Sequence, residues 1–98
     1  MEKKTPHYKL ARAQALVTQG AYRATMSARA GAAALGLGLD EMLAVVLALT
    51  RTDFDKSMTT HSDHTVWQDV YKPSTATGPV YLKLTVINDV LIVSFKER

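Results

Sequence analysis

The fold of this chain is decided by the stretch Tyr81-Leu-Lys-Leu-Thr-Val-Ile-Asn-Asp-Val-Leu-Ile-Val-Ser-Phe-Lys96, in which two alternating runs are joined by Asn88 and Asp89. A two-residue Asn-Asp connection between such runs is typical of a tight β-hairpin. This turn fixes the register of the two strands. It pairs Ile87 with Val90 and predicts three apolar pairs that face the core: Val86 with Leu91, Leu84 with Val93, and Leu82 with Phe95.

The opposite face of this hairpin carries most of its polar side chains. The same register gives three pairs there: Thr85 with Ile92, Lys83 with Ser94, and Tyr81 with Lys96. A phenol and two ammonium groups therefore stand together on the exposed side of the sheet, which suits the handling of a phosphodiester. Exposed strand lysines also protect sheet edges from unwanted pairing, so both interpretations stay open.

Two shorter runs upstream, over residues 56–60 and 66–71, also alternate. If residues 61–65 form the turn between them, the pairs are Thr60 with Val66, Met58 with Gln68, and Lys56 with Val70. Lys56 and Gln68 then share a face. Whether Tyr81 and Lys96 lie on that same face depends on the connection over residues 73–79, and the sequence leaves this open.

The first half of the chain has helical periodicity. Three helices are expected: from a Thr5-Pro6 cap to Gly20, over residues 24–35 with a cap at Thr25 or Ser27, and over residues 41–49 with Asp40 as cap. The third is apolar nearly all round, so it is expected to be buried as the main support under the sheet. Helices followed by strands predict an α+β fold, with N-terminal helices packed on a C-terminal antiparallel sheet.

Length and composition limit the remaining possibilities. The 98 residues predict one domain, 1–98, and the absence of cysteine excludes disulfides, thiolate metal sites and a cysteine nucleophile. The chain starts without the apolar core of a signal peptide, and its longest apolar run, residues 42–49, is far below the ~20 residues that cross a bilayer. A cytoplasmic location without a membrane partner is therefore expected.

Positive charge is concentrated near the start of the chain. The net charge is +3, and six basic residues precede residue 30, opposed there by Glu2 alone: Lys3, Lys4, Lys9, Arg12, Arg23 and Arg29. Such asymmetry favours a polyanionic partner through counterion release. A solvated basic surface that merely keeps the protein soluble is an equally open interpretation.

Several other side chains have two possible interpretations. His61, Asp63 and His64 have ligand chemistry for a transition metal, but Ser62-Asp63 is also ordinary turn chemistry and three ligands within one turn rarely converge. His64 can alternatively act as an acid or base near neutral pH. For Trp67 and Tyr71, packing in the core is favoured over stacking on nucleic-acid bases.

The sequence resembles the MqsR (motility quorum-sensing regulator) toxins along essentially its whole length. The matching segments are residues 1–7, Leu-Gly-Leu before Asp40, and residues 53–54, 56–60, 62–64, 67–71 and 89–97. The resemblance implies a RelE-like microbial ribonuclease fold and metal-independent, cofactor-free cleavage of RNA at GC-containing triplets. It also implies a partner: MqsA, a zinc-containing antitoxin that binds DNA.

The resemblance also implies site residues. The family's catalytic lysine, glutamine and tyrosine fall on Lys56, Gln68 and Tyr81, and a further important lysine falls on Lys96. We also expect three residues to bind RNA: Lys83, Met58 and Lys72.

Two positions depart from the family pattern. Asp55 stands where the family usually has tyrosine, which removes a possible base-stacking ring and puts a carboxylate next to Lys56. In a regular strand, Asp55 and Lys56 would point to opposite sides. Asn88 stands in the last hairpin turn where a histidine is found in the family, so we assign it no catalytic role.

Together these observations predict an endoribonuclease toxin of a type II toxin–antitoxin system that inhibits translation. Without metal, the 2′-hydroxyl of RNA attacks the adjacent phosphorus and leaves a 2′,3′-cyclic phosphate, so the protein must move protons and stabilise negative charge. We expect Lys56 and Lys96 to stabilise charge, one of them also transferring a proton if like charges lower its pKa. Tyr81 is the candidate base or acid, and Gln68 positions the substrate.

The alternative is a non-catalytic regulator that binds nucleic acid through the same basic sheet. A His61/His64 metal hydrolase and a purely protein-binding regulator rank lower. The partners expected for the toxin are mRNA and an MqsA-type antitoxin, with operator DNA reached only indirectly through the antitoxin complex.

Overall fold

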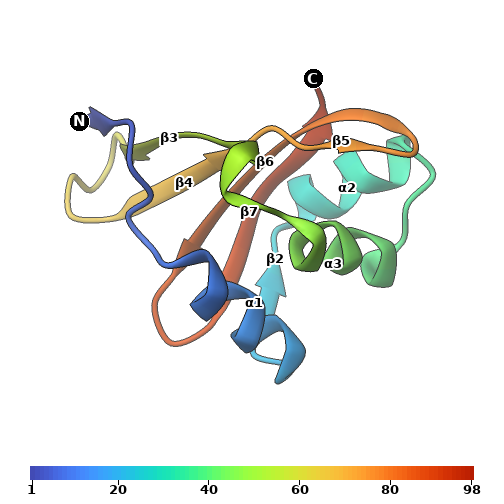
Figure 1. The fold of residues 1–98 in the computed structure, drawn as a ribbon, viewed down its shortest axis with the longest axis horizontal. Helices are drawn as coiled ribbons and strands as arrows, with labels where there is room; N and C mark the ends of the chain where they lie inside the picture. The colour runs from blue at the N-terminus through green and yellow to red at the C-terminus, as the bar shows by residue number, and fades with distance from the viewer.

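Three helices and two short strands make up the first half of the chain, and only strands follow residue 53. The computed structural model describes residues 1–98 (Figure 1). In chain order the elements are β1 (Glu2–Lys3), α1 (Leu10–Thr18), β2 (Tyr22–Ala24), α2 (Met26–Ala34), α3 (Leu39–Ala48), the 3-10 turn η1 (Arg51–Asp53), β3 (Phe54–Thr59), β4 (Trp67–Tyr71), β5 (Ser74–Thr75), β6 (Gly78–Val86) and β7 (Val90–Glu97). The α+β class is confirmed. The expectation that the helices precede all strands is wrong, because β1 and β2 belong to the N-terminal half.

The main sheet has the strand order β1-β3-β4-β6-β7-β2, and β5 pairs separately with β6. Every neighbour is antiparallel except β2, which runs parallel to β7, so the expected wholly antiparallel sheet is wrong at this edge. Here the Val90 N–H donates to the Ala21 carbonyl at 3.0 Å, and the Thr25 N–H donates to the Ile92 carbonyl at 3.1 Å. Pairing these backbone groups explains why a short extended segment lies between two helices.

The β6–β7 hairpin keeps the predicted register only at its open end. Tyr81 pairs with Lys96, Leu82 with Phe95, and Lys83 with Ser94. Nearer the turn the partners shift by one residue, to Leu84 with Ile92, Thr85 with Leu91, and Val86 with Val90. Four predicted pairs are therefore wrong: Ile87–Val90, Val86–Leu91, Leu84–Val93 and Thr85–Ile92.

A bulge explains this difference. The register of β7 shifts between its pairs with Lys83 and Leu84, which leaves Val93 without a partner. An extra residue reverses the alternation of a strand, so residues with even and odd numbers can reach the same face. Val90, Ile92 and Phe95 are consequently all buried, with at most 1% of their surface exposed. Burying all three requires a longer turn, and Ile87 within that turn is 69% exposed.

Helix α1 begins at Leu10, later than the predicted Thr5-Pro6 cap. Residues 7 and 8 are instead held in place by Asp69 of β4, because its carboxylate accepts the His7 N–H at 3.1 Å and the Tyr8 N–H at 3.0 Å. The predicted end is confirmed: Gly20 follows the helix with φ of +81°, a conformation that glycine adopts without strain.

The caps of the other two helices differ in how well they were predicted. Thr25 caps α2 as expected, since its Oγ1 accepts the Ala28 N–H at 3.0 Å. Helix α3 starts at Leu39 after Gly38, whose N–H donates to Glu41 Oε1 at 3.0 Å. Asp40 is therefore not the cap but lies in the first turn, where a carboxylate is favoured by the helix dipole.

Helix α2, not α3, packs most closely on the sheet, so the predicted role of α3 as main support is wrong. Small residues allow this approach: a Cβ on Gly31 would lie only 1.8 Å from the carbonyl oxygen of Phe95 in β7. Helix α3 lies against α1 and α2, and buries Met42, Leu43 and Val46. Its longer apolar side chains fill the space that the alanine-rich α2 leaves.

All three helices share one hydrophobic cluster of 17 buried residues with the inner side chains of β4, β6 and β7. Figure 1 shows the helices grouped together, away from the edge where the N-terminus lies beside β3. No single helix is long and apolar enough to cross a membrane; only α2 and α3 taken together, bent by 92° at the break between them, meet the length and composition required.

We expect Gly31→Ala to destabilise the protein, although alanine is a better helix former by about 1 kcal/mol. Its Cβ would meet the backbone of β7, so α2 would have to move outward at an overpacking cost of about 3 kcal/mol. Urea unfolding measures the difference. Ala33→Gly, at an exposed position of the same helix, is the control and should cost only about 1 kcal/mol from propensity. A Gly31→Ala protein as stable as its parent would contradict the close contact.

Candidate functional site

The register of the sheet brings the predicted site residues onto one face. Lys56 pairs with Val70, Val70 with Lys83, and Lys83 with Ser94, so these four side chains form a row across β3, β4, β6 and β7. Directly opposed residues in antiparallel strands point to the same side. Lys56 therefore lies on the face of Lys83, which settles the relation that the sequence left open.

Two further rows flank this one. The predicted pair of Met58 with Gln68 is confirmed, and Glu2 of β1 continues that row, because it pairs with Met58. On the other side Tyr81 pairs with Lys96. In the upstream hairpin, the Thr60 N–H donates to the Val66 carbonyl at 3.1 Å, as the predicted turn requires. We call the side chains of these three rows, together with Lys72 at the end of β4, the basic face.

Two ammonium groups surround the phenol of Tyr81. Lys96 Nζ lies 5.3 Å from the centre of its ring, and Lys83 Nζ lies 5.8 Å from it. Neither lysine forms an ion pair within the protein. Both positive charges are thus available to an anion placed beside Tyr81.

Lys56 forms an ion pair with a carboxylate, and the sequence did not indicate this contact. Its Nζ lies 3.2 Å from Glu2 Oε1, and both side chains remain partly exposed. The hydrogen bond and charge of Glu2 are the main reasons why the pKa of Lys56 is raised above its usual value. No sequence signal indicated this contact, because a two-residue strand at the start of a chain has no recognisable periodicity.

Lys83 has the opposite shift. Burial is the main cause that lowers its pKa, and the positive charges of Lys96 and Lys56 lower it further. We expected the lysine with a lowered pKa to be Lys56 or Lys96. For Lys56 that is wrong, because the hydrogen bond and charge of Glu2 outweigh the effect of burial; it is the pKa of Lys83 that is lowered.

Asp55 lies in a second bulge, where the pairing shifts between Phe54 and Lys56. The regular alternation on which its predicted orientation depended is therefore interrupted. Its carboxylate is 3.4 Å from Lys72 Nζ, and it also contributes to the raised pKa of Lys56. Two of the expected RNA-binding and catalytic lysines thus have a carboxylate neighbour.

Trp67 and Tyr71 point away from the basic face, as their alternation with Gln68 predicts. Tyr71 is buried, and burial raises its pKa to about 12. Trp67 stacks on His7 with ring centres 5.0 Å apart, and Lys3 Nζ lies 4.3 Å from the centre of its ring. Tyr71 therefore packs in the core, as predicted. For Trp67 the prediction of core packing is wrong, because its ring is only partly buried and packs against His7 and Lys3 outside the hydrophobic cluster.

The segment His61–His64 is a turn at the end of the β3–β4 hairpin. Asp63 accepts hydrogen bonds from the N–H and hydroxyl of Thr65, and these bonds lower its pKa. The turn interpretation of Asp63 is confirmed. No group of three or more His, Cys, Asp or Glu side chains is placed to hold a metal ion.

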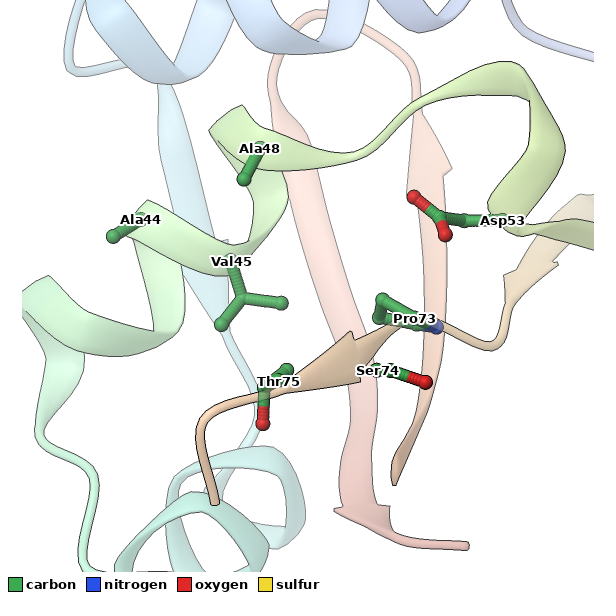
Figure 2. A pocket seen from close by; sticks show the side chains of 7 residues that line it. All are labelled: Ala44, Val45, Ala48, Asp53, Pro73, Ser74 and Thr75. Atoms are coloured by element: carbon green, nitrogen blue, oxygen red, sulfur yellow. The ribbon is translucent and has the colours of Figure 1, made fainter. Parts of the chain in front are cut away.

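One pocket lies away from the basic face, against helix α3. It has a volume of about 250 Å³ and runs between α3 and the segment that follows β4 (Figure 2). Its walls are Ala44, Val45 and Ala48 on one side and Pro73, Ser74 and Thr75 on the other. Asp53 at its end already accepts the Thr50 N–H at 2.8 Å. It contains no cationic group, so it offers nothing to a phosphate.

The basic face combines charge with a phenol and an amide, and a hollow of about 400 Å³ borders it at Glu2 and Met58. Lysine ammonium groups bind phosphate as point charges, and a tyrosine hydroxyl can donate or accept a proton. An extended polyanion can lie along such a face and contact several rows at once. The arrangement is chemically suited to bind nucleic acid and to act on a phosphodiester beside Tyr81.

Comparison with known proteins gives two matches. The family described as "Motility quorum-sensing regulator, toxin of MqsA" matches residues 5–97. The mRNA interferase toxin MqsR of Escherichia coli (strain K12) is 58% identical over 98 residues, which cover all of both chains.

We expect Lys83 to lose its proton at lower pH than Lys56, because burial and two positive neighbours disfavour its charge while Glu2 favours that of Lys56. NMR titration of lysine side chains measures both values. Lys96→Gln should raise the pKa of Lys83 by removing a repelling charge, whereas Lys4→Gln, at an exposed position outside the basic face, should not. If Lys83 titrated at or above Lys56, this account of the charges would be wrong.

Proposed function

Because the chain belongs to the motility quorum-sensing regulators, the toxins of MqsA, as the resemblance indicated, we propose that it is an endoribonuclease toxin that cleaves mRNA. The observation that carries this proposal is the placement of Lys56, Lys83 and Lys96 on one open face with Tyr81. The printed name of the Escherichia coli relative supports the same activity. The fold is proposed to be RelE-like, and the whole chain, 1–98, to form one toxin domain.

The proposed reaction needs no metal. The 2′-hydroxyl oxygen of RNA forms a bond to the adjacent phosphorus while the bond from phosphorus to the 5′-oxygen breaks. The products are a 2′,3′-cyclic phosphate and a free 5′-hydroxyl. One proton leaves the 2′-hydroxyl and one is delivered to the 5′-oxygen, while negative charge builds on the phosphate oxygens.

Lys56 and Lys96 are proposed to stabilise that charge. The raised pKa of Lys56 supports this role, because the group stays protonated and cannot easily act as a base. Tyr81 is the proposed proton donor or acceptor, since the ammonium groups of Lys96 and Lys83 lie 5.3 Å and 5.8 Å from the centre of its ring. Gln68 lies in the row next to that of Lys56 and has no titratable group, so it is proposed to position the substrate.

RNA is proposed to follow the basic face beyond the reacting phosphate. Lys83, Met58 and Lys72 are the proposed contacts; the register places Met58 and Lys83 on this face, and Lys72 directly follows β4. Cleavage is proposed to favour GC-containing triplets. The family description supports an MqsA-type antitoxin as protein partner. Operator DNA is proposed to be bound only indirectly, through the complex with that antitoxin.

A defined mRNA incubated with the purified protein in excess EDTA tests the activity. We expect discrete cuts at GC-containing triplets, with 2′,3′-cyclic phosphate ends. Tyr81→Phe should keep RNA affinity and lower cleavage by ~10²–10⁴-fold, because it removes only the exchangeable proton. Binding without cuts would favour a non-catalytic regulator, loss of cleavage in EDTA would indicate a metal enzyme, and a Tyr81→Phe protein within threefold of its parent would exclude Tyr81 from proton transfer.

Lys56→Ala and Lys96→Ala should reduce turnover more than RNA binding, since the charge they face develops in the transition state. Lys4→Ala is the control, because Lys4 is exposed and makes no ion pair. It should weaken binding slightly and lower its salt dependence without changing turnover. Single-turnover rates and binding constants at several salt concentrations measure both effects. Equal effects of all three substitutions would show that the lysines only attract RNA.

A further inference from the structure

Strand β1 adds a second carboxylate, besides that of Asp55, to the positively charged groups of the basic face. Glu2 pairs with Met58 at the edge of the sheet, and its side chain reaches diagonally to Lys56, with Oε1 at 3.2 Å from Nζ. Figure 1 shows the N-terminus lying beside β3 at this edge. The sequence suggested no role for Glu2 beyond its opposite charge.

The position of Glu2 is fixed from two sides. The Thr59 N–H of β3 donates to the Met1 carbonyl at 2.9 Å, next to the paired residues of β1. Farther along the segment, Asp69 accepts the N–H groups of His7 and Tyr8. A short strand held at both ends has little freedom, so its side chain meets Lys56 at low cost in conformational entropy.

The charged and titratable groups that act on Lys56 are Glu2 on β1, Asp55 on β3, and Tyr81 and Lys83 on β6. Lys72 after β4 lies beside Asp55, and Lys96 on β7 acts on Lys83. Asp55 is paired with Lys72 instead. Glu2 is therefore the one carboxylate within ion-pair distance of Lys56, and it opposes the repulsion between Lys56 and Lys83.

We propose that Glu2 is a positioning residue of the ribonuclease site, and that its carboxylate holds the Lys56 ammonium over the basic face. This inference rests on the proposed function. In this proposal, β1 contributes a side chain to the site in addition to forming the edge of the sheet. Glu2 contributes through Lys56 and not by contact with RNA, since a carboxylate beside a phosphodiester repels it.

That distinction predicts a particular kinetic pattern for Glu2→Gln. Loss of the negative charge leaves Lys56 less well held, and kcat should fall between about 10- and 100-fold, the scale of a misplaced catalytic group. KM for RNA should stay the same or decrease, because a repelling charge has been removed. A residue needed only for folding would change stability, and a residue that binds RNA would raise KM.

The pH dependence supplies an independent readout. Glu2 raises the pKa of Lys56, so removing its charge lets Lys56 lose its proton at lower pH. If cleavage requires protonated Lys56, the alkaline limb of the rate profile moves to lower pH in Glu2→Gln. NMR titration of Lys56 should show the same shift without any RNA present. Glu2→Asp keeps the charge on a shorter side chain and should restore part of both properties.

Glu97→Gln is the matched control, because Glu97 is an exposed glutamate of β7 without an ion pair. It should leave kcat, the pH profile and the pKa of Lys56 unchanged, and urea midpoints verify that all variants are folded. If the parent protein cleaves RNA but Glu2→Gln behaves like Glu97→Gln, this inference alone would be overturned. A parent protein that cuts no RNA would overturn the proposed function, and the inference with it.

Discussion

The buried carboxylate of Asp69 is the contact on which the N-terminal arrangement depends. It is fully buried and accepts two backbone N–H groups from residues 7 and 8. A hydrogen bond to a charged group contributes about 1.5–3 kcal/mol, and an ionised side chain left unpaired in the interior would be strongly destabilising. Asp69 therefore prevents a helix from starting at Thr5 and directs the preceding residues along β3. The position of Glu2 beside Lys56 follows from that redirection.

The sheet has the hydrophobic core on one face and the charged side chains of the basic face on the other. Gly31 lets α2 lie directly on β7, and the bulge at Val93 lets Val90, Ile92 and Phe95 all turn toward the helices. Beyond the bulge the strand returns to the register that pairs Tyr81 with Lys96. The irregularity that improves the core thus lies next to the pair on which the proposed chemistry depends, and it does not disturb that pair.

Charge on the basic face is graded from edge to centre. Carboxylates occupy the β1–β3 side, where Glu2 pairs with Lys56 and Asp55 with Lys72. Lys83 and Lys96 have no such partner, and crowding contributes to the lowered pKa of Lys83. An anion is therefore attracted most strongly toward Tyr81, because the positive charges there are not already neutralised. The carboxylate of Asp55 beside Lys72 strengthens that gradient.

The sequence by itself determined the family, the α+β class, the two hairpins and the shared face of Tyr81 and Lys96, because alternation and contiguous motifs are local properties of a chain. It also indicated the caps at Thr25 and the end of α1 at Gly20, which depend on neighbouring residues only. The tertiary structure decided the parallel β2, the shifted turn, the late start of α1 and the contact of Glu2 with Lys56. Each of these depends on a partner distant in sequence: the free edge of β7, the packing under α2, and the buried charge of Asp69. Local patterns carry no information about such partners. The two-residue strand β1 and the contact of its Glu2 carboxylate with Lys56 were therefore found only in the folded structure.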